Sequence, residues 1–427
     1  MPDQLWPGRP RPLRDETFSS WFARVAMANG LSSKELFRAA LPGAHLHSRD
    51  LDRLACPQLI STMAEKTGVD TEQVRVLPLQ TWLGRLIEED TGINKLLWLP
   101  PVGKEAAGRK SFGQQACPRC LSEEIPYLRK IWRLGFVTIC EAHSVSLVDR
   151  CTRCGVSLSP NSSWDPAGRI RCHECGQAYK DMPAAEVEWE ADILIQRMLI
   201  DAAQAGWMMM GTAGHVHSLA AFRVLMILFR FLATGRYSLP LRAWLSERAP
   251  IPTSPPANIP RVKEVEHLNP RCRRELLRQA HYLLQDWPDR FIEACRSVGA
   301  SSRDLLRGRE VPFAYWHVVT SHLAEPVRVL EAAEVTAAAE YLSNRGQTPH
   351  YRALLELTGN KLSPHREVIE PVVYASYGEG RYWKLDGVSP EIRTAVKQAA
   401  RRKGENVAGW VEHALRAALE RDKSAVS

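Results

Sequence analysis

The stretch CEAHSVSLVDRCTRCG, residues 140–155, contains four side chains of the kind that bind metal ions. They form two pairs, Cys140 with His143 and Cys151 with Cys154, and two residues separate the members of each pair. Such a pair forms a tight turn, here called a knuckle, whose side chains converge on one ion. The stretch therefore predicts that metal ligation organises the middle of the chain.

Two further knuckles flank this stretch, CPRC upstream and CHEC downstream. Eight ligands complete two four-coordinate sites, which is typical of structural zinc, since catalytic zinc keeps one position open. The cofactors expected are two structural Zn²⁺ ions. The predicted ligands are Cys117, Cys120, Cys140 and His143 for one ion, and Cys151, Cys154, Cys172 and Cys175 for the other.

The four knuckles can share two ions in more than one way. Consecutive knuckles can pair, or the first can pair with the third and the second with the fourth. We expect consecutive pairing, because it closes shorter loops at a lower entropic cost. His173 is an alternative ligand beside Cys172. Gly155 and Gly176 directly follow the last ligand of a knuckle, where positive φ is often needed.

The 427 residues carry a net charge of +8 and ten cysteines. The N-terminus has no apolar segment of a secretory signal, so the cysteines indicate a reducing compartment and we expect a cytoplasmic, nucleoid-associated protein. The most apolar stretch, 219–235, is interrupted by Arg223 and Arg230, which favours a buried helix and no membrane partner. The positive excess lies in 101–180 and 381–427, and it permits phosphate contacts as readily as a solvated surface.

Helical periodicity predicts a mainly α, multi-domain chain. In its N-terminal part, Asp15 is expected to cap a helix that begins near residue 16, and residues 57–83 read as a helix-turn-helix, either a DNA-reading element or plain core packing. The expected segments are an N-terminal helical, helix-turn-helix-like domain (1–100), a double zinc ribbon or knuckle module (101–183), a helical domain (184–249), a proline-rich linker (250–260), a second helical domain (261–372) and a small β-α-α tail (378–427).

The tail begins with a predicted strand, 381–386, and continues with helices that start near Ser389 and Asn406. This pattern resembles the ribbon-helix-helix domain, in which two chains pair and their strands enter the major groove. The resemblance implies a homodimer that binds DNA. The alternative is a strand and helical hairpin that dock on the protein's own body. The candidate DNA-binding residues are Arg381, Tyr382, Lys384, Arg401, Arg402 and Lys403.

Familiar catalytic motifs are missing from the sequence. It contains neither H-E-x-x-H nor G-x-S-x-G, and Arg109 interrupts the phosphate-loop-like stretch 103–111. We therefore expect no catalytic residues and no enzymatic activity; an enzyme that uses zinc is the alternative in this class.

Two stretches resemble the TniQ family. One is WPGRPRPLRDETFSSWFARVA at 6–26, and the other combines ACPRCL with YLRKIWRLGFVTICEAHSVSL at 127–147. The resemblance implies a non-catalytic, TnsD-like adaptor of DNA transposition that selects a target, either a DNA site or a DNA-bound CRISPR effector complex. Such an adaptor recruits an AAA+ ATPase of the TnsC or TniB kind and, through it, a transposase. The candidate partner-binding residues are Arg11, Arg14 and Trp21. The alternative function is a transcriptional regulator with zinc ribbons and a ribbon-helix-helix tail.

Overall fold

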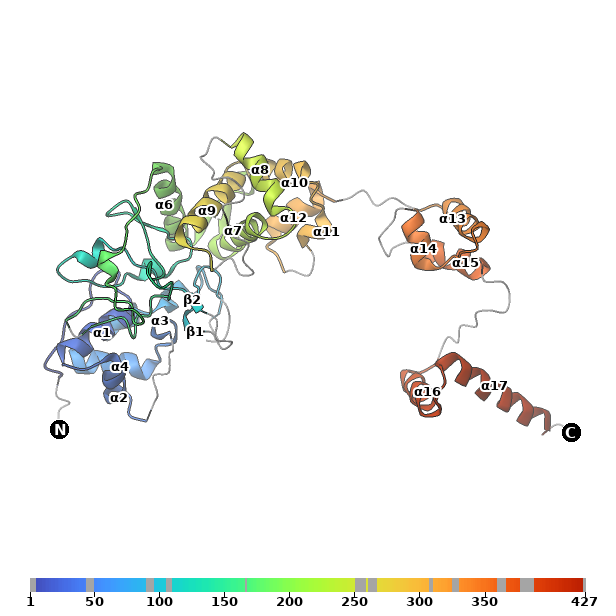
Figure 1. The fold of residues 1–427 in the computed structure, drawn as a ribbon, viewed down its shortest axis with the longest axis horizontal. Coiled ribbons are helices and arrows are strands. Elements are labelled where there is room, and N and C mark those ends of the chain that lie inside the picture. The colour runs from blue at the N-terminus through green and yellow to red at the C-terminus, as the bar shows by residue number, and fades with distance from the viewer. Residues whose placement is uncertain are drawn as a thin grey trace. The chain divides into compact units, whose positions relative to one another are not determined.

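The computed structural model is mainly helical, as expected (Figure 1). The chain divides into two compact units, 1–325 and 326–427, which are treated separately below. The residues that the structure describes are 5–43, 50–89, 96–104, 110–165, 167–249, 259, 267–306, 310–324, 330–358, 366–376 and 388–424.

The N-terminal helices pack around one core that runs from Phe18 to Leu77. Phe18, Trp21, Phe22 and Val25 occupy one face of the first helix and are fully buried. The expected cap is wrong: Thr17 accepts the hydrogen bond from Ser20, whereas Asp15 adopts a positive φ of 57° outside the helix. The elements are α1 (Phe18–Ala28), α2 (Ser33–Ala40), α3 (Leu51–Leu54), α4 (Pro57–Thr67), α5 (Thr71–Arg75) and η1 (Leu79–Trp82).

The expected helix-turn-helix geometry is present in α4 and α5. Gly68 ends α4 in the left-handed conformation, with φ of 69°, and the Asp70 carboxylate accepts hydrogen bonds from the amides of Glu72 and Gln73. However, α5 has five residues, and Asp70 and Glu72 beside the turn are exposed acidic side chains. A short helix with acidic neighbours is poorly suited to a row of phosphates, so the geometry favours packing over DNA reading.

The middle of unit 1 consists of loops, short 3₁₀ turns and two-stranded antiparallel ladders. Together with the helices that follow, it forms a single hydrophobic core from Leu79 to Leu323. The elements are β1 (Val102–Lys104) paired with β2 (Lys110–Phe112), β3 (Ile139–Cys140) with β4 (Val145–Ser146), β5 (Trp207–Met209) with β6 (His215–His217), η2 (Cys120–Ser122), η3 (Lys130–Arg133), η4 (Tyr179–Asp181) and η5 (Gly211–Ala213).

Helix α7, the apolar stretch expected to be buried, lies against α8 and α9 (Figure 1). Helix α10 packs on α8 and α9, and α12 packs on α10. Among the described residues no single helix is long and apolar enough to cross a membrane, and α7 and α8 meet that test only as a pair bent by 99°. The helices are α6 (Glu190–Ala205), α7 (Ser218–Ala233), α8 (Ser238–Arg248), α9 (Pro270–Gln285), α10 (Asp289–Ser297), α11 (Ser302–Leu306) and α12 (Phe313–His322).

Unit 2 begins inside the range 261–372 that the sequence suggested as one helical domain. Its helices α13 to α15 enclose a small core from Leu330 to Ile369. The expected linker 250–260 lies outside the described residues except for Ile259, which is buried in the core of unit 1. The helices of unit 2 are α13 (Ala332–Asn344), α14 (Tyr351–Leu357), α15 (Arg366–Ser376), α16 (Pro390–Lys403) and α17 (Val407–Ser424).

The two helices of the predicted tail are confirmed. Ser389 caps α16, Gly404 ends it with φ of 67°, and the Asn406 side chain accepts the Gly409 amide at the start of α17. The predicted strand 381–386 lies outside the described residues, so the ribbon-helix-helix assignment stays a prediction.

Candidate metal centres and the contacts that position them

The first candidate metal centre joins the knuckle Cys117–Cys120 to the knuckle Cys140–His143. The sulfur atoms of Cys120 and Cys140 are 3.6 Å apart. The His143 Nδ1 atom lies 3.7 Å from the Cys117 sulfur, 3.3 Å from the Cys120 sulfur and 3.6 Å from the Cys140 sulfur. The second nitrogen of this ring, Nε2, faces Glu123 at 3.9 Å, which leaves Nδ1 for a metal.

The second candidate centre joins the other two knuckles. The Cys151 and Cys175 sulfur atoms are 3.5 Å apart, and so are those of Cys154 and Cys172. In each centre the four ligand atoms lie within 4.8 Å of one another. Consecutive pairing is thus the arrangement that the structure contains, and Cys172 itself, not the neighbouring His173, belongs to the cluster.

These distances fit one ion at the middle of each cluster. Zinc–sulfur bonds of about 2.3 Å in a tetrahedron place the sulfur atoms about 3.8 Å apart, close to the spacing in both clusters. Metals bind thiolates. In each cluster one thiol ionises more readily than an ordinary cysteine. The side chains of Cys117 and Cys120 lower the pKa of Cys140, and the Gln177 amide lowers that of Cys175 to about 7. The Cys117 side chain raises the pKa of Cys120, and burial raises that of Cys172. Both clusters could therefore hold a metal ion and are compatible with zinc.

In three of the four knuckles, the residue directly after the last ligand has a positive φ. Gly155 and Gly176 have φ of 70° and 73°, as the sequence indicated, and their amides bond back to the carbonyls of Cys151 and Cys172. Ser144 takes the same position after His143 with φ of 49°, which sequence reasoning missed because serine does not announce this conformation.

Hydrogen bonds of α1 attach the N-terminal helices to the first centre. The Ser20 hydroxyl accepts the Leu128 amide at 3.0 Å and donates to the buried Glu16 carboxylate at 2.8 Å. That carboxylate also pairs with Arg24 at 2.8 Å. The Leu128 carbonyl accepts the Thr17 amide at 2.9 Å. Glu16, Ser20 and Arg24, which belong to the TniQ-like stretch 6–26, therefore serve internal structure.

A buried ion-pair group makes a second attachment. Arg133 is fully buried; it donates to Asp50 at 3.0 Å, to Asp52 at 2.9 Å and to the Gly113 carbonyl at 3.0 Å. Burial disfavours its charged form, but the charges and hydrogen bonds of Asp50 and Asp52 outweigh burial and raise the pKa of Arg133. Asp52 in turn accepts the amide and the hydroxyl of Ser19, at 2.7 and 2.8 Å. Ser19 thus orients the Asp52 carboxylate, which binds Arg133 of the metal module.

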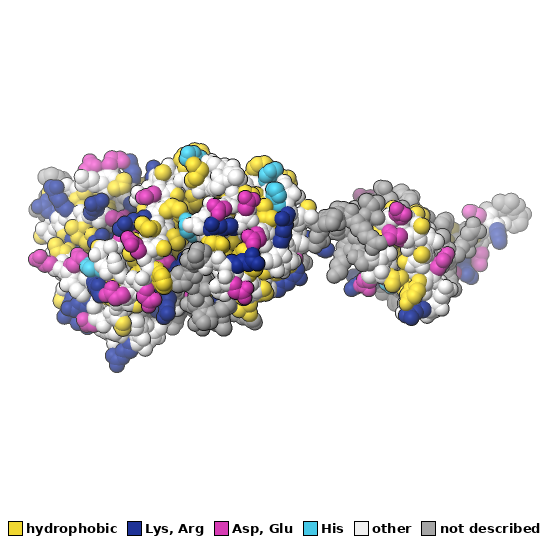
Figure 2. Space-filling view, turned by 90° about the horizontal axis from the view of Figure 1, so that it is seen from above, with side chains coloured by type: hydrophobic (Ala, Val, Ile, Leu, Met, Phe, Trp, Pro, Cys, Tyr) yellow, Lys and Arg dark blue, Asp and Glu magenta, His cyan; other side chains and the backbone are white. Residues whose placement is uncertain are grey.

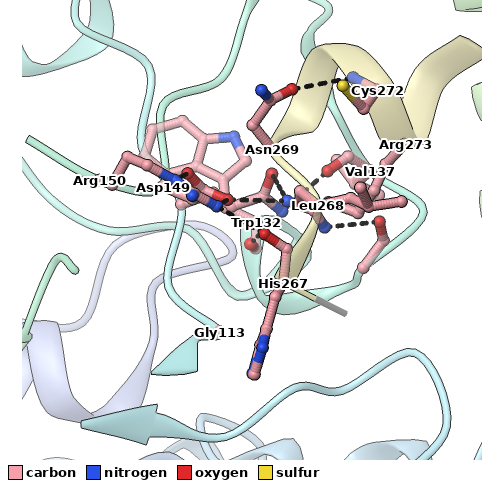
Figure 3. Close-up of polar contacts among 12 residues, drawn as sticks. Gly113, Trp132, Val137, Asp149, Arg150, His267, Leu268, Asn269, Cys272 and Arg273 are labelled. Atoms are coloured by element: carbon pink, nitrogen blue, oxygen red, sulfur yellow. Dashed lines mark hydrogen bonds and ion pairs between the residues drawn. The ribbon is translucent and has the colours of Figure 1, made fainter. Parts of the chain in front are cut away.

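A third attachment starts from residues 144–150, the connector between the two centres (Figure 3). Asp149 directly precedes Arg150, the last residue of that connector. Its carboxylate accepts hydrogen bonds from Arg150 at 2.7 Å and from Arg273 of α9 at 3.3 Å. Arg273 also donates to the Gly135 carbonyl at 2.7 Å. Burial lowers the pKa of Arg273, and Asp149 opposes that effect. Since Asp149 is 1% exposed, the pair is a buried link between the metal module and the helical region.

The predicted partner-binding residues have different surroundings. Trp21 is fully buried, and its indole N–H donates to the Pro10 carbonyl at 2.8 Å. Its prediction as a direct partner contact is therefore corrected: Trp21 anchors the N-terminal arm, here residues 7–14. Gly8 is held in the same way by Asn29, whose side chain exchanges two hydrogen bonds with it at 2.7 and 3.0 Å.

The other predicted contact residues are exposed or fall outside the described residues. Arg11 and Arg14 have exposed side chains on the arm, and Arg401, Arg402 and Lys403 are exposed in the last turn of α16. Arg381, Tyr382 and Lys384 lie outside the described residues. On the face of the molecule in Figure 2, Lys and Arg side chains are interspersed with Asp and Glu side chains, so this face offers no uniformly basic surface.

Comparison with known proteins agrees with the order of these elements. Residues 7–147 match the family model described as TniQ. The match contains the arm, the N-terminal helices and all four ligands of the first centre, and it ends inside the connector. No curated protein matches the chain.

Proposed function

From the premise that residues 7–147 form a TniQ domain, we propose that this protein is a non-catalytic adaptor of DNA transposition. It recognises a target, either a DNA site or a DNA-bound effector complex, and recruits an AAA+ ATPase, which brings the transposase. The family match carries the proposal. Glu16, Ser20 and Arg133 support an adaptor role, because their hydrogen bonds connect structural elements.

The metal in both centres is proposed to be zinc, with a structural role. Each cluster supplies four ligand atoms, and four ligands close the tetrahedral shell that zinc prefers. The first centre holds Cys140 at the end of β3, and η3, which ends at Arg133, precedes this strand in the chain. Ligation there keeps the N-terminal helices attached, whereas the second centre orders residues 151–176 beside the helical region.

Recruitment of the ATPase is proposed to use the arm, through the exposed Arg11 and Arg14. In a pull-down, the zinc-loaded full-length chain is immobilised and incubated with the AAA+ ATPase of the same transposon, with and without ATP and duplex DNA. The wild-type chain should retain the ATPase, and Arg11→Glu with Arg14→Glu should retain it more weakly. Lys34→Glu, an exposed cation of α2, is the matched control. No retention of the ATPase under any condition contradicts the adaptor function.

Direct target binding is proposed for a dimer formed through the tail. In α16 and α17 only Ala400 is buried among the described side chains, while Ile392 and Leu419 are 56% and 62% exposed. A helical pair with so little core needs a cover, and a second copy supplies one. Leu419→Asp should shift the sedimenting species from dimer to monomer; an unchanged dimer argues against tail pairing.

DNA binding is proposed for the predicted strand and for the last turn of α16. The double variant Tyr382→Ala with Lys384→Ala should weaken binding to the specific site. Neutralising Arg401, Arg402 and Lys403 should flatten the salt dependence of log K by about 0.9 for each phosphate that the tail no longer neutralises. Unchanged affinity and slope would show that the tail does not bind DNA.

A further inference from the structure

A cavity of about 630 Å³ lies in unit 1 among the loop before α1, η3, the first centre and α6. The loop before α1 provides Arg14 and Asp15, and the first centre provides Ile139 to Ala142. The region of η3 provides Arg129, Ile131 and Trp132. Helix α6 closes the remaining side, from Gln196 to Gln204. Its volume is in the range of pockets that enclose a ligand or several side chains.

The floor of the cavity is apolar and rigid. Trp132, Ile139 and Ile200 are buried and line it. Gln196 holds this floor, because its side-chain oxygen accepts the amides of Thr138 and Ile139 at 2.8 and 3.0 Å and its nitrogen donates to the Ile139 carbonyl at 3.0 Å. A preformed apolar floor suits an aliphatic side chain, because the protein loses little conformational freedom when that side chain binds.

The charged side chains that line the cavity come from two parts of unit 1. Arg14, Asp15 and Arg129 precede the first centre and together carry a net positive charge. Glu141, Arg197 and Asp201 belong to the first centre and to α6 and together carry a net negative charge. Arg197, which also lines the cavity, pairs with Glu141 at 3.0 Å. A row of phosphates brought to this cavity would meet the carboxylates of Asp15, Glu141 and Asp201, so the lining disfavours nucleic acid.

Arg129 supplies an unused hydrogen-bond donor. Its guanidinium lies 5.3 Å and 5.7 Å from the ring centres of Tyr127 and Trp132, and its buried Nε atom has no hydrogen-bond partner. A planar guanidinium held between rings is well placed to bind a carboxylate with little loss of freedom.

We propose that this cavity binds a short segment of a protein partner that inserts an aliphatic side chain onto the Ile139–Ile200 floor. A carboxylate of the segment faces Arg14 and Arg129, and a basic side chain faces Glu141 and Asp201. The proposal assigns the chemistry of the segment and does not depend on which protein supplies it, so it goes beyond the proposed function.

The test uses the full-length zinc-loaded chain with labelled isoleucine δ1-methyl groups. The probes are acetyl-Glu-Gly-Leu-Gly-Lys-amide and the same peptide in reversed order, titrated to millimolar concentration. At least one should shift the methyl signals of Ile131, Ile139 and Ile200, which Ile→Val variants assign, while Ile292 in α10 stays unshifted. Replacing Glu by Gln or Leu by Ser in the peptide should weaken binding roughly tenfold.

Two variants of α6 separate a specific site from a general charge effect. Asp201→Arg should weaken binding of the peptide at least about fivefold, because it removes one of the two carboxylates that face the basic side chain of the segment. Glu190→Arg makes the same charge change at an exposed position of α6 outside the cavity and should leave binding unchanged; thermal unfolding checks that both variants fold. The proposal is overturned if neither peptide shifts the three methyl groups, if both variants bind equally, or if a short DNA duplex shifts the same signals.

Discussion

Replacing Arg273 by Met tests the buried link between the metal module and the helical region. Methionine keeps much of the apolar stem, so the change removes chiefly the guanidinium. Three neutral acceptors lose their donor: the carbonyls of Leu268 and Gly135, at 3.0 and 2.7 Å, and the side-chain oxygen of Gln115, at 3.1 Å. Asp149 loses one of its two arginines and keeps Arg150.

The magnitude follows from these hydrogen bonds and the ion pair. A typical hydrogen bond contributes about 1 kcal/mol, so three acceptors account for about 3 kcal/mol. A buried charge left without a partner costs about 3–5 kcal/mol, but Asp149 keeps Arg150, so losing its bond to Arg273 adds up to about 2 kcal/mol. We therefore expect Arg273→Met to lower the opening free energy of α9 by about 3–5 kcal/mol, which corresponds to about 100- to 4,000-fold faster amide exchange.

Native-state hydrogen exchange on peptides from α9 measures this effect in the full-length protein, where unfolding of two units is not one transition. Arg271→Met is the matched control: the side chain is exposed on the same helix, and its loss should change the free energy by less than about 0.5 kcal/mol. Combining Arg273→Met with Asp149→Asn should cost about 0.5–3 kcal/mol less than the sum of the single changes. Equal exchange in the Arg273 and Arg271 variants, or full additivity, refutes the link.

Three further outcomes follow from the site. Cys151→Ser should lower the bound metal from two ions to one per chain by mass spectrometry and speed amide exchange around residues 151–176, whereas Cys272→Ser, a thiol outside both centres, should change neither; two ions retained by Cys151→Ser would contradict the second centre. Gly8→Ala should displace the arm, because the added Cβ would lie 2.3 Å from the Ala28 carbonyl oxygen, and the Trp21 indole proton should then exchange faster. Arg9→Ala, at an exposed arm position, is the control. An unchanged exchange rate of the indole proton in Gly8→Ala refutes the anchoring. Ser19→Ala removes the hydroxyl that donates to the buried Asp52 and should destabilise the N-terminal helices by about 1–3 kcal/mol in thermal unfolding, whereas Ser61→Ala on the exposed side of α4 should have little effect.

Local patterns were predictable because their chemistry is local. Two ligands with two residues between them converge on one point in any knuckle, so the spacing predicted all eight candidate ligands. Shorter loops favour consecutive pairing, and the structure contains that pairing. The caps of α16 and the glycine that ends α4 follow from preferences of single residues.

The roles of the charged residues depended on partners that are distant in the chain. Arg133 meets Asp50 and Asp52, and Arg273 meets Asp149; none of these pairs has a periodic signature in the sequence. Trp21 looked like a contact residue, but an aromatic ring on an amphipathic helix face is buried when the arm crosses it. Sequence by itself therefore determined the metal ligands, the helices and the resemblance to TniQ. Only the tertiary structure decided which charged groups are buried as partners and where a cavity forms, because burial and long-range pairing depend on the packing of the whole unit.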